Sequence, residues 1–160
     1  PVTELTTNVD IVKTGIRIAA GEPIGFSPGD LRIDGWAIEC RICAEDPDRG
    51  FLPSPGEIVA FEPPGGPGVR IDSGVSSGAK VTAFYDPMIA KLVCWGRDRD
   101  EAIERTRRAL GELVVRGIET TIPFHRRVLE NPAFLSGRYD TSFIAAEMSA
   151  RAPLESGVAG

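Results

Sequence analysis

Runs of glycine and proline divide residues 36–96 into short segments, and this division constrains the fold more than any other feature of the sequence. The turn-rich runs read PSPG, PPGGPG, SSG and YDP. Between them lie five segments typical of β-strands: WAIECRI, GEIVAFEPP, GVRIDSGV, AKVTA and MIAKLVCWG. Because short strands at this spacing commonly pair in opposite directions, we expect an antiparallel sheet or a half-barrel.

A helical pattern precedes this strand-rich region. Apolar residues from Val9 to Ala19 recur at steps of three and four residues, which predicts one N-terminal helix. Asn8 is the predicted N-cap of this helix, and the sequence GEP at 21–23 is the predicted stop.

The C-terminal third is predicted to be helical. One stripe of the first helix consists of Ile103, Thr106, Leu110 and Leu113. Asp98 stands at its N-cap position, with Glu101 three residues later. A last strand is expected at 114–120, followed by helices in TIPFHRRVLE and, behind Asp140 or Thr141, in DTSFIAAEMSA. The sequence therefore predicts an α+β fold: an antiparallel sheet or half-barrel with an N-terminal helix and about three C-terminal helices.

Charge and hydropathy exclude several classes of protein. The 160 residues carry a net charge of −5, whereas nucleic-acid binding demands a basic face. The sequence contains neither an apolar run long enough to span a membrane nor a signal-peptide pattern at its start. We therefore expect no nucleic-acid or membrane partner and a cytoplasmic location, with Cys40, Cys43 and Cys94 as reduced, buried thiols.

The strand-like segment 36–43 carries two charges in an otherwise apolar context. Because side chains alternate along a strand, one face should be a core face made of Trp36, Ile38, Cys40 and Ile42. Glu39 and Arg41 then lie together on the opposite face. They form either a surface ion pair or an arginine that is directed at a ligand.

Other candidate sites have weaker support from the residues. Cys40 and Cys43 form a C-x-x-C pair, but a strand sends the two sulfur atoms to opposite faces, and we expect no metal site. His125, the only histidine, lies early in a predicted helix, where a structural role is typical. Tyr85 and Asp86 belong either to a simple turn or to the rim of a site, and both interpretations stay open.

Four long motifs occur in order at short spacings: ECRICAEDPDRGFLPSPGEI, PPGGPGVRIDSGV, FYDPMIAKLVCWG and RALGELVVRGIETTIPFHRRVL. Together they resemble the C-terminal domain of biotin carboxylase, the ATP-dependent component of acetyl-CoA, propionyl-CoA and related acyl-CoA carboxylases and of pyruvate carboxylase. The opening segment PVTELTTNVDIVKTGIRIAAGEP resembles the stretch that follows the active-site strand of the ATP-grasp region in this family, and FLSGRYDTSFI resembles the end of the family domain.

The resemblance implies a role for the charged strand. Family members use ATP to activate bicarbonate as carboxyphosphate and then carboxylate N1 of biotin. The arginine of the family's E-C-R motif contacts the ureido oxygen of biotin, and this role would fall on Arg41. Glu39, Tyr85 and Asp86 would support it.

The resemblance also implies sites at three other positions. Arg70 matches the region where family members form a homodimer, and Pro67 stands where an aromatic residue is common. Thr141 would lie near the adenine pocket. Trp36 occupies a position where the family often has histidine.

Cofactors and partners follow from the same resemblance. A carrier domain would present biotin, a missing upstream half would bind most of ATP and Mg²⁺, and a carboxyltransferase subunit would complete the parent enzyme. Residues 1–30 would be an N-terminal helix and linker at the tail end of the ATP-grasp region, 31–146 the C-terminal domain, and 147–160 a linker or disordered tail. We expect a fragment that is inactive alone; the alternative is a non-catalytic dimerisation or carrier-docking module derived from this family.

Overall fold

A three-stranded antiparallel sheet forms the centre of the protein in the computed structural model, which describes residues 1–148. Its strands are β1 (Trp36–Cys43), β8 (Met88–Gly96) and β6 (Val69–Ser73), in the order β1-β8-β6. The nine-residue strand β8 lies in the middle because nearly all of its side chains are apolar, and both of its faces are covered. The predicted antiparallel sheet is confirmed.

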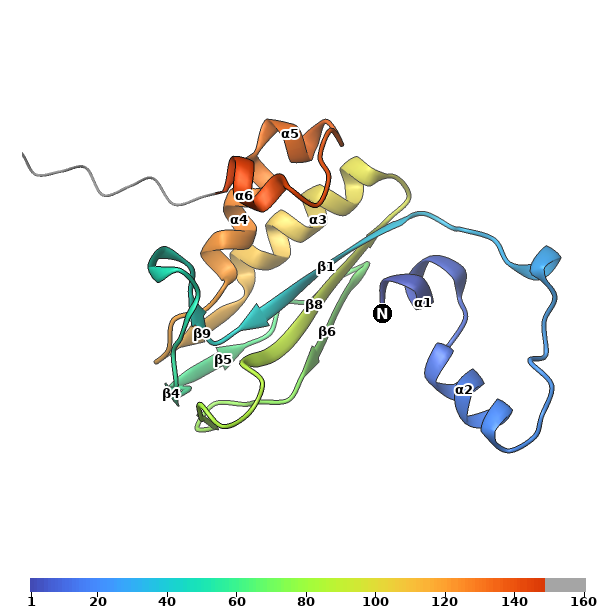
Figure 1. Cartoon of the computed structure of the whole chain (residues 1–160), viewed down its shortest axis with the longest axis horizontal. Helices are drawn as coiled ribbons and strands as arrows, with labels where there is room; N and C mark the ends of the chain where they lie inside the picture. The colour runs from blue at the N-terminus through green and yellow to red at the C-terminus, as the bar shows by residue number, and fades with distance from the viewer. Residues whose placement is uncertain (149–160) are drawn as a thin grey trace, which may run out of the picture.

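The main core lies between this sheet and helix α3 (Arg99–Glu112). Cys40, Ile42, Leu92 and Cys94 point from the sheet toward Ile103 and Leu110. The predicted stripe of α3 is buried, and Asp98 caps the helix as expected, because its Oδ1 accepts a hydrogen bond from the backbone N–H of Glu101 at 2.8 Å. Figure 1 shows α3 and α4 (Ile122–Glu130) on one side of the sheet and the N-terminal helices on the other.

Three pairs of short strands extend the fold beyond the central sheet: β2 (Glu45–Asp46) with β3 (Leu52–Pro53), β4 (Gly56–Glu57) with β7 (Lys80–Val81), and β5 (Ala60–Glu62) with β9 (Val114–Arg116). The single strand predicted for GEIVAFEPP is in fact the two strands β4 and β5. The chain changes partner between them, since the N–H of Ile58 bonds to Ala79 and that of Val59 to Arg116. The described part of the chain forms open sheets and closes no barrel.

The predicted N-terminal helix is present as α2 and ends before Gly21 as expected, but its predicted start at Asn8 is wrong and a further helix precedes it. Two helices are present, α1 (Val2–Thr7) and α2 (Ile11–Ala19). Asn8 ends α1 in a left-handed conformation with φ 57°, which asparagine tolerates better than most residues. The N-cap of α2 is Asp10, whose carboxylate accepts a hydrogen bond from Lys13 N at 2.8 Å.

The prediction that Trp36 lies on the core face is also wrong, because the residue is 54% exposed. Its register partner is Gly96, which offers no side chain to pack against. The neighbouring Trp95 is held instead, since its indole N–H donates to the carbonyl of Asp34 at 2.9 Å and the guanidinium of Arg105 lies over its ring.

The C-terminal elements after β9 and α4 are short. They are α5 (Pro132–Leu135) and α6 (Phe143–Glu147), and two 3₁₀ turns, η1 (Pro28–Asp30) and η2 (Pro47–Arg49), lie earlier in the chain. Helix α6 begins after Ser142 rather than directly after Asp140 or Thr141. Apart from Glu147 and Met148, the predicted tail 147–160 lies outside the described residues. Among residues 1–148 no helix is both long and apolar enough to cross a membrane.

Candidate functional site

Arg41 and Glu39 lie on the face of the sheet opposite the α3 core, as the alternation along β1 predicted. Their side chains form an ion pair with 3.3 Å between Arg41 Nε and Glu39 Oε1. The side chain of Glu39 is 14% exposed, whereas that of Arg41 is 72% exposed. Because an exposed pair contributes only about 0–1 kcal/mol, the guanidinium stays available to a ligand.

The strand register brings further charges to this face. Arg41 pairs with Lys91 of β8, which pairs with Asp72 of β6; the adjacent row contains Glu39, Val93 and Arg70. The sequence analysis missed Lys91. A lysine between Ala90 and Leu92, in an otherwise apolar strand, is the signal that could have identified it.

Arg70, a predicted dimer residue, is engaged within the chain. Its Nε lies 2.9 Å from Asp72 Oδ1, and its Nη1 lies 3.3 Å from Glu4 Oε1 of helix α1. The Asp72 carboxylate raises the pKa of Arg70, and the Arg70 guanidinium lowers the pKa of Asp72. Pro67 is exposed in the turn before β6. The dimer role of both residues stays a prediction.

The loop that carries Tyr85 and Asp86 lies beside the end of β1. Asp86 closes the turn, because its Oδ1 accepts from Met88 N at 2.8 Å, and the carbonyl of Pro87 accepts from Ala44 N at the same distance. Burial, with the charges of Glu45 and Asp86, raises the pKa of Cys43. Asp86 is therefore close to the strand segment that presents Arg41, while Tyr85 projects outward and is 84% exposed.

Helix α4 contacts the other edge of β1 at the same point. The hydroxyl of Thr121 donates to the carbonyl of Arg41 at 2.9 Å, and His125 Nε2 lies 2.9 Å from the same oxygen. Burial lowers the pKa of His125, although its bond to Arg41 opposes this effect. No sequence signal identifies this contact, because its partners are 80 and 84 residues apart.

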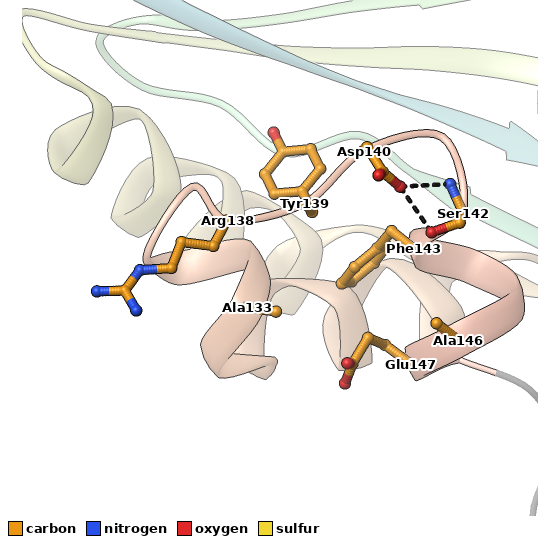
Figure 2. Close-up of a pocket in the computed structure, with 8 residues that line it drawn as sticks. All are labelled: Ala133, Arg138, Tyr139, Asp140, Ser142, Phe143, Ala146 and Glu147. Carbon is orange, nitrogen blue, oxygen red and sulfur yellow. Dashed lines mark hydrogen bonds between the residues drawn. The ribbon is translucent and has the colours of Figure 1, made fainter.

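Two hollows lie beside the last helices, away from the central sheet. One, with a volume of about 280 Å³, is lined by Phe124, His125, Phe134, Thr141 and Ile144 among others, so Thr141 borders a largely apolar cavity. The other, of about 350 Å³, is drawn in Figure 2. There the Asp140 carboxylate accepts hydrogen bonds from the backbone N–H and hydroxyl of Ser142, while the side chain of Arg138 points away.

Within residues 1–148, no group of three or more histidine, cysteine, aspartate or glutamate side chains is arranged to hold a metal ion. The structure thus pairs Arg41 with Glu39 on β1, and it places Asp86 in the loop beside Cys43 at the end of this strand. Arg70 lies further along the same sheet face, and Thr141 lies at a separate cavity.

Comparison with known proteins identifies the family of this fold. The model for the biotin carboxylase C-terminal domain matches residues 39–146. The chain belongs to this family.

The curated members of the biotin carboxylase family that match this chain are much longer than it. Biotin carboxylase 1 of Bacillus subtilis is 51% identical over 144 residues, which are 90% of this chain and 32% of that protein. The propionyl-CoA carboxylase alpha chain of Ruegeria pomeroyi is 45% identical, with 92% of this chain and 24% of that protein covered. The chain therefore spans about a third or less of these curated relatives.

Solved structures of the biotin carboxylase family have the same fold. The biotin carboxylase domain dimer of the Hydrogenobacter thermophilus 2-oxoglutarate carboxylase, in complex with MgADP, ADP and bicarbonate, matches with a TM-score of 0.88 and 44% identity. The match covers 91% of this chain and 32% of that one. The biotin carboxylase subunit of pyruvate carboxylase matches with a TM-score of 0.89 and 43% identity, over 91% of this chain and 32% of that one. The predicted α+β class is thereby confirmed, whereas the roles of Arg41, Glu39, Tyr85, Asp86 and Thr141 stay predictions.

Proposed function

We propose that this chain is the C-terminal part of a biotin carboxylase, which uses ATP and bicarbonate to carboxylate biotin on a carrier domain. This would be the first half-reaction of an acyl-CoA carboxylase. The observation that carries the proposal is the exposed guanidinium of Arg41, presented from a rigid strand next to Glu39. A relative with this fold binds bicarbonate and MgADP, which supports the same ligand class here.

In this proposal Arg41 stabilises negative charge on the ureido oxygen of the substrate biotin. A guanidinium stays protonated at every working pH and donates hydrogen bonds in a planar fork, so it can stabilise the charge that grows on this oxygen as N1 loses its proton. The side chain of Arg41 is 72% exposed, which would let a carrier-borne ring approach it.

Glu39, Asp86 and Tyr85 would support Arg41. The Glu39 carboxylate is mostly buried and contacts Arg41 Nε, so it can orient the guanidinium while leaving its outer edge for a ligand. Asp86 would stabilise the loop beside this strand through its bond to Met88 N, and Tyr85 would form part of the rim.

The chain's share of the nucleotide site would be small. Thr141 borders an apolar cavity, a surface that suits the flat face of an adenine ring. Most contacts to ATP and Mg²⁺ would come from the part of the relatives that this chain does not span, and the nucleotide would supply the energy that activates bicarbonate.

Dimerisation and partner docking complete the proposal. Strand β6 is an edge of the central sheet, and Arg70 lies on it, with Pro67 in the turn before it. A homodimer contact through this edge would join two such domains. A biotin carrier domain and a carboxyltransferase subunit are the further partners that we propose, in the cytoplasm, where the three free cysteines would stay reduced.

A non-catalytic dimerisation or carrier-docking module is the second candidate. It is favoured by one observation: β6 is an edge strand of the central sheet, a position that suits pairing with a second copy.

The test is a hybrid enzyme in which this chain replaces the matching third of Biotin carboxylase 1. ATP turnover that depends on both bicarbonate and free biotin is measured for the hybrid and for this chain alone. We expect activity only in the hybrid, and Arg41→Ala should lower it about 10²–10³-fold, as for loss of one donor to a developing oxyanion. The matched control is Arg116→Ala, an exposed arginine on β9, outside the central sheet. Full activity of Arg41→Ala would refute the assigned role, and a folded but inactive hybrid would favour the docking module.

A further inference from the structure

The outer edge of β1 is completed by side chains rather than by another strand. In the sheet order β1-β8-β6, β1 has a neighbour on one side only. Backbone groups on a strand edge need other hydrogen-bond partners when they are shielded from water. At Arg41 and Cys43 these partners come from the start of helix α4, namely Thr121 and His125, which we call the α4 clasp.

The α4 clasp makes four hydrogen bonds to two residues of β1. The Thr121 hydroxyl accepts from Cys43 N at 3.0 Å and donates to the carbonyl of Arg41 at 2.9 Å. The Thr121 backbone N–H donates to the carbonyl of Cys43 at 3.1 Å. His125 Nε2 approaches the carbonyl of Arg41 at 2.9 Å, and because a carbonyl can only accept, this nitrogen must carry a proton.

The clasp acts where the sheet itself is irregular. The register between β1 and β8 shifts between Ile42 and Cys43, one residue after Arg41. Thr121 is only 5% exposed, so water cannot readily replace its hydroxyl. The hydrogen bonds from α4 therefore hold the main chain at Arg41 on one side. On the other side, the regular pairing of β1 with β8 ends at the next residue.

The position of the Arg41 guanidinium depends on this main chain. Its side chain is largely exposed, and Glu39 contacts only its Nε, so the place of the guanidinium also depends on where the main chain holds the residue. A displacement of the backbone carries directly to the charged group, and small displacements of a catalytic group are costly in rate.

We propose that Thr121 and His125 are positioning residues that hold the carbonyl of Arg41 and so direct its guanidinium at the ligand. This inference rests on the proposed role of Arg41 in contacting biotin. Neither residue touches the ligand itself in this scheme; both act through the backbone of β1.

The kinetic test uses the same hybrid enzyme and two matched pairs of variants. Thr121→Val keeps the shape of threonine without its hydroxyl, whereas Thr121→Ser keeps the hydroxyl. His125→Leu removes the ring donor, whereas His125→Gln keeps an N–H group. We expect Thr121→Val and His125→Leu to lower kcat/KM for free biotin about tenfold or more, and the conservative variants to stay within about threefold of the parent. KM for ATP should stay unchanged in Thr121→Val; it is compared in this variant only, because His125 also borders the cavity assigned to adenine.

The outcomes separate this inference from the function on which it rests. Full activity of the Arg41→Ala variant would refute the proposed role of Arg41 in biotin carboxylation. Loss of activity in Arg41→Ala together with parental kcat/KM for biotin in folded Thr121→Val and His125→Leu overturns the clasp alone. A rise in KM for ATP in Thr121→Val, beside the fall in kcat/KM for biotin, would indicate a merely structural role and would also overturn it.

A second measurement needs no variant and no activity. His125 is the only histidine of the 160-residue chain, so its two ring nitrogens can be assigned directly in a long-range ¹H–¹⁵N NMR spectrum. At neutral pH we expect the neutral tautomer with the proton on Nε2, which donates to Arg41. The tautomer with its proton on Nδ1 would leave Nε2 unable to donate and would refute the His125 contact.

Discussion

A single methyl group at Gly96 should be strongly destabilising. Gly96 ends β8 where the first turn of α3 packs against the strand. A Cβ atom at this position would lie 2.8 Å from the carbonyl carbon of Glu101 and 3.0 Å from Cα of Ala102, and closer still to the backbone nitrogen of Ala102. All three neighbours are backbone atoms of one helix, so no side chain can rotate away to make room.

The expected cost follows from this geometry. Extra atoms in a closely packed site typically cost about 1–3 kcal/mol, and rigid backbone neighbours place Gly96→Ala near the upper end. In a chain of this length each kcal/mol shifts Tm by about 2–4 °C, so Tm should fall by about 6–12 °C.

Gly111→Ala is the matched control. Gly111 lies near the end of the same helix, is exposed, and has no atom within 4 Å of an added Cβ. Replacing a helical glycine by alanine reduces the entropy of the unfolded chain and should add about 0.5–1 kcal/mol of stability.

Urea and thermal unfolding, followed by far-UV circular dichroism, measure both variants against the parent chain. We expect shifts of opposite sign at an unchanged denaturant slope. If Gly96→Ala stayed within about 0.5 kcal/mol of the parent, which is the usual range for an uncrowded surface site, the close approach of α3 to the end of β8 would be refuted.

Two further predictions concern titratable groups. Burial holds the pKa of His125 below its ordinary value of 6.5, so the unfolded chain takes up this proton first as the pH falls. The free energy of unfolding should therefore decline below pH 6.5, and the His125→Gln variant should lack this part of the decline. Urea unfolding midpoints measured across the pH range check this prediction. Equal pH dependence in the variant and the parent chain would contradict it. Burial also raises the pKa of Cys40 to about 12 and raises the pKa values of Cys43 and Cys94, but only Cys43 is partly exposed. Iodoacetamide should alkylate Cys43 first in the folded chain, as measured by peptide mass spectrometry, and earlier labelling of Cys40 or Cys94 would count against the described packing.

Elements with a strong local signal were predicted well from the sequence. β8 was identified because its apolar run is long and turn residues precede it, and α3 because its stripe and its Asp98 cap agree. The errors fall where local signals compete. Asn8 is suitable both for capping a helix start and for a left-handed helix end, and GEIVAFEPP looks continuous although its neighbours change at Ile58.

Some parts of the candidate site could likewise be predicted from local patterns in the sequence, and others could not. Alternation along β1 was sufficient to place Glu39 and Arg41 together on the face away from the core. The same reasoning failed for Trp36, because burial depends on what lies opposite, and Gly96 lies there. The position of Lys91 opposite Arg41 follows from the strand register, which the sequence does not specify by itself.

Residues close together in the sequence were enough to predict the periodic elements, and the ordered motifs resemble the biotin carboxylase C-terminal domain. Both are local properties, since periodicity and capping depend on residues within a few positions of one another. The contact of Thr121 and His125 with the carbonyl of Arg41, across 80 and 84 residues of chain, follows from three-dimensional packing alone. The reason is physical: an edge strand must satisfy its outer backbone groups, but which distant side chains reach them depends on how α4 packs in three dimensions.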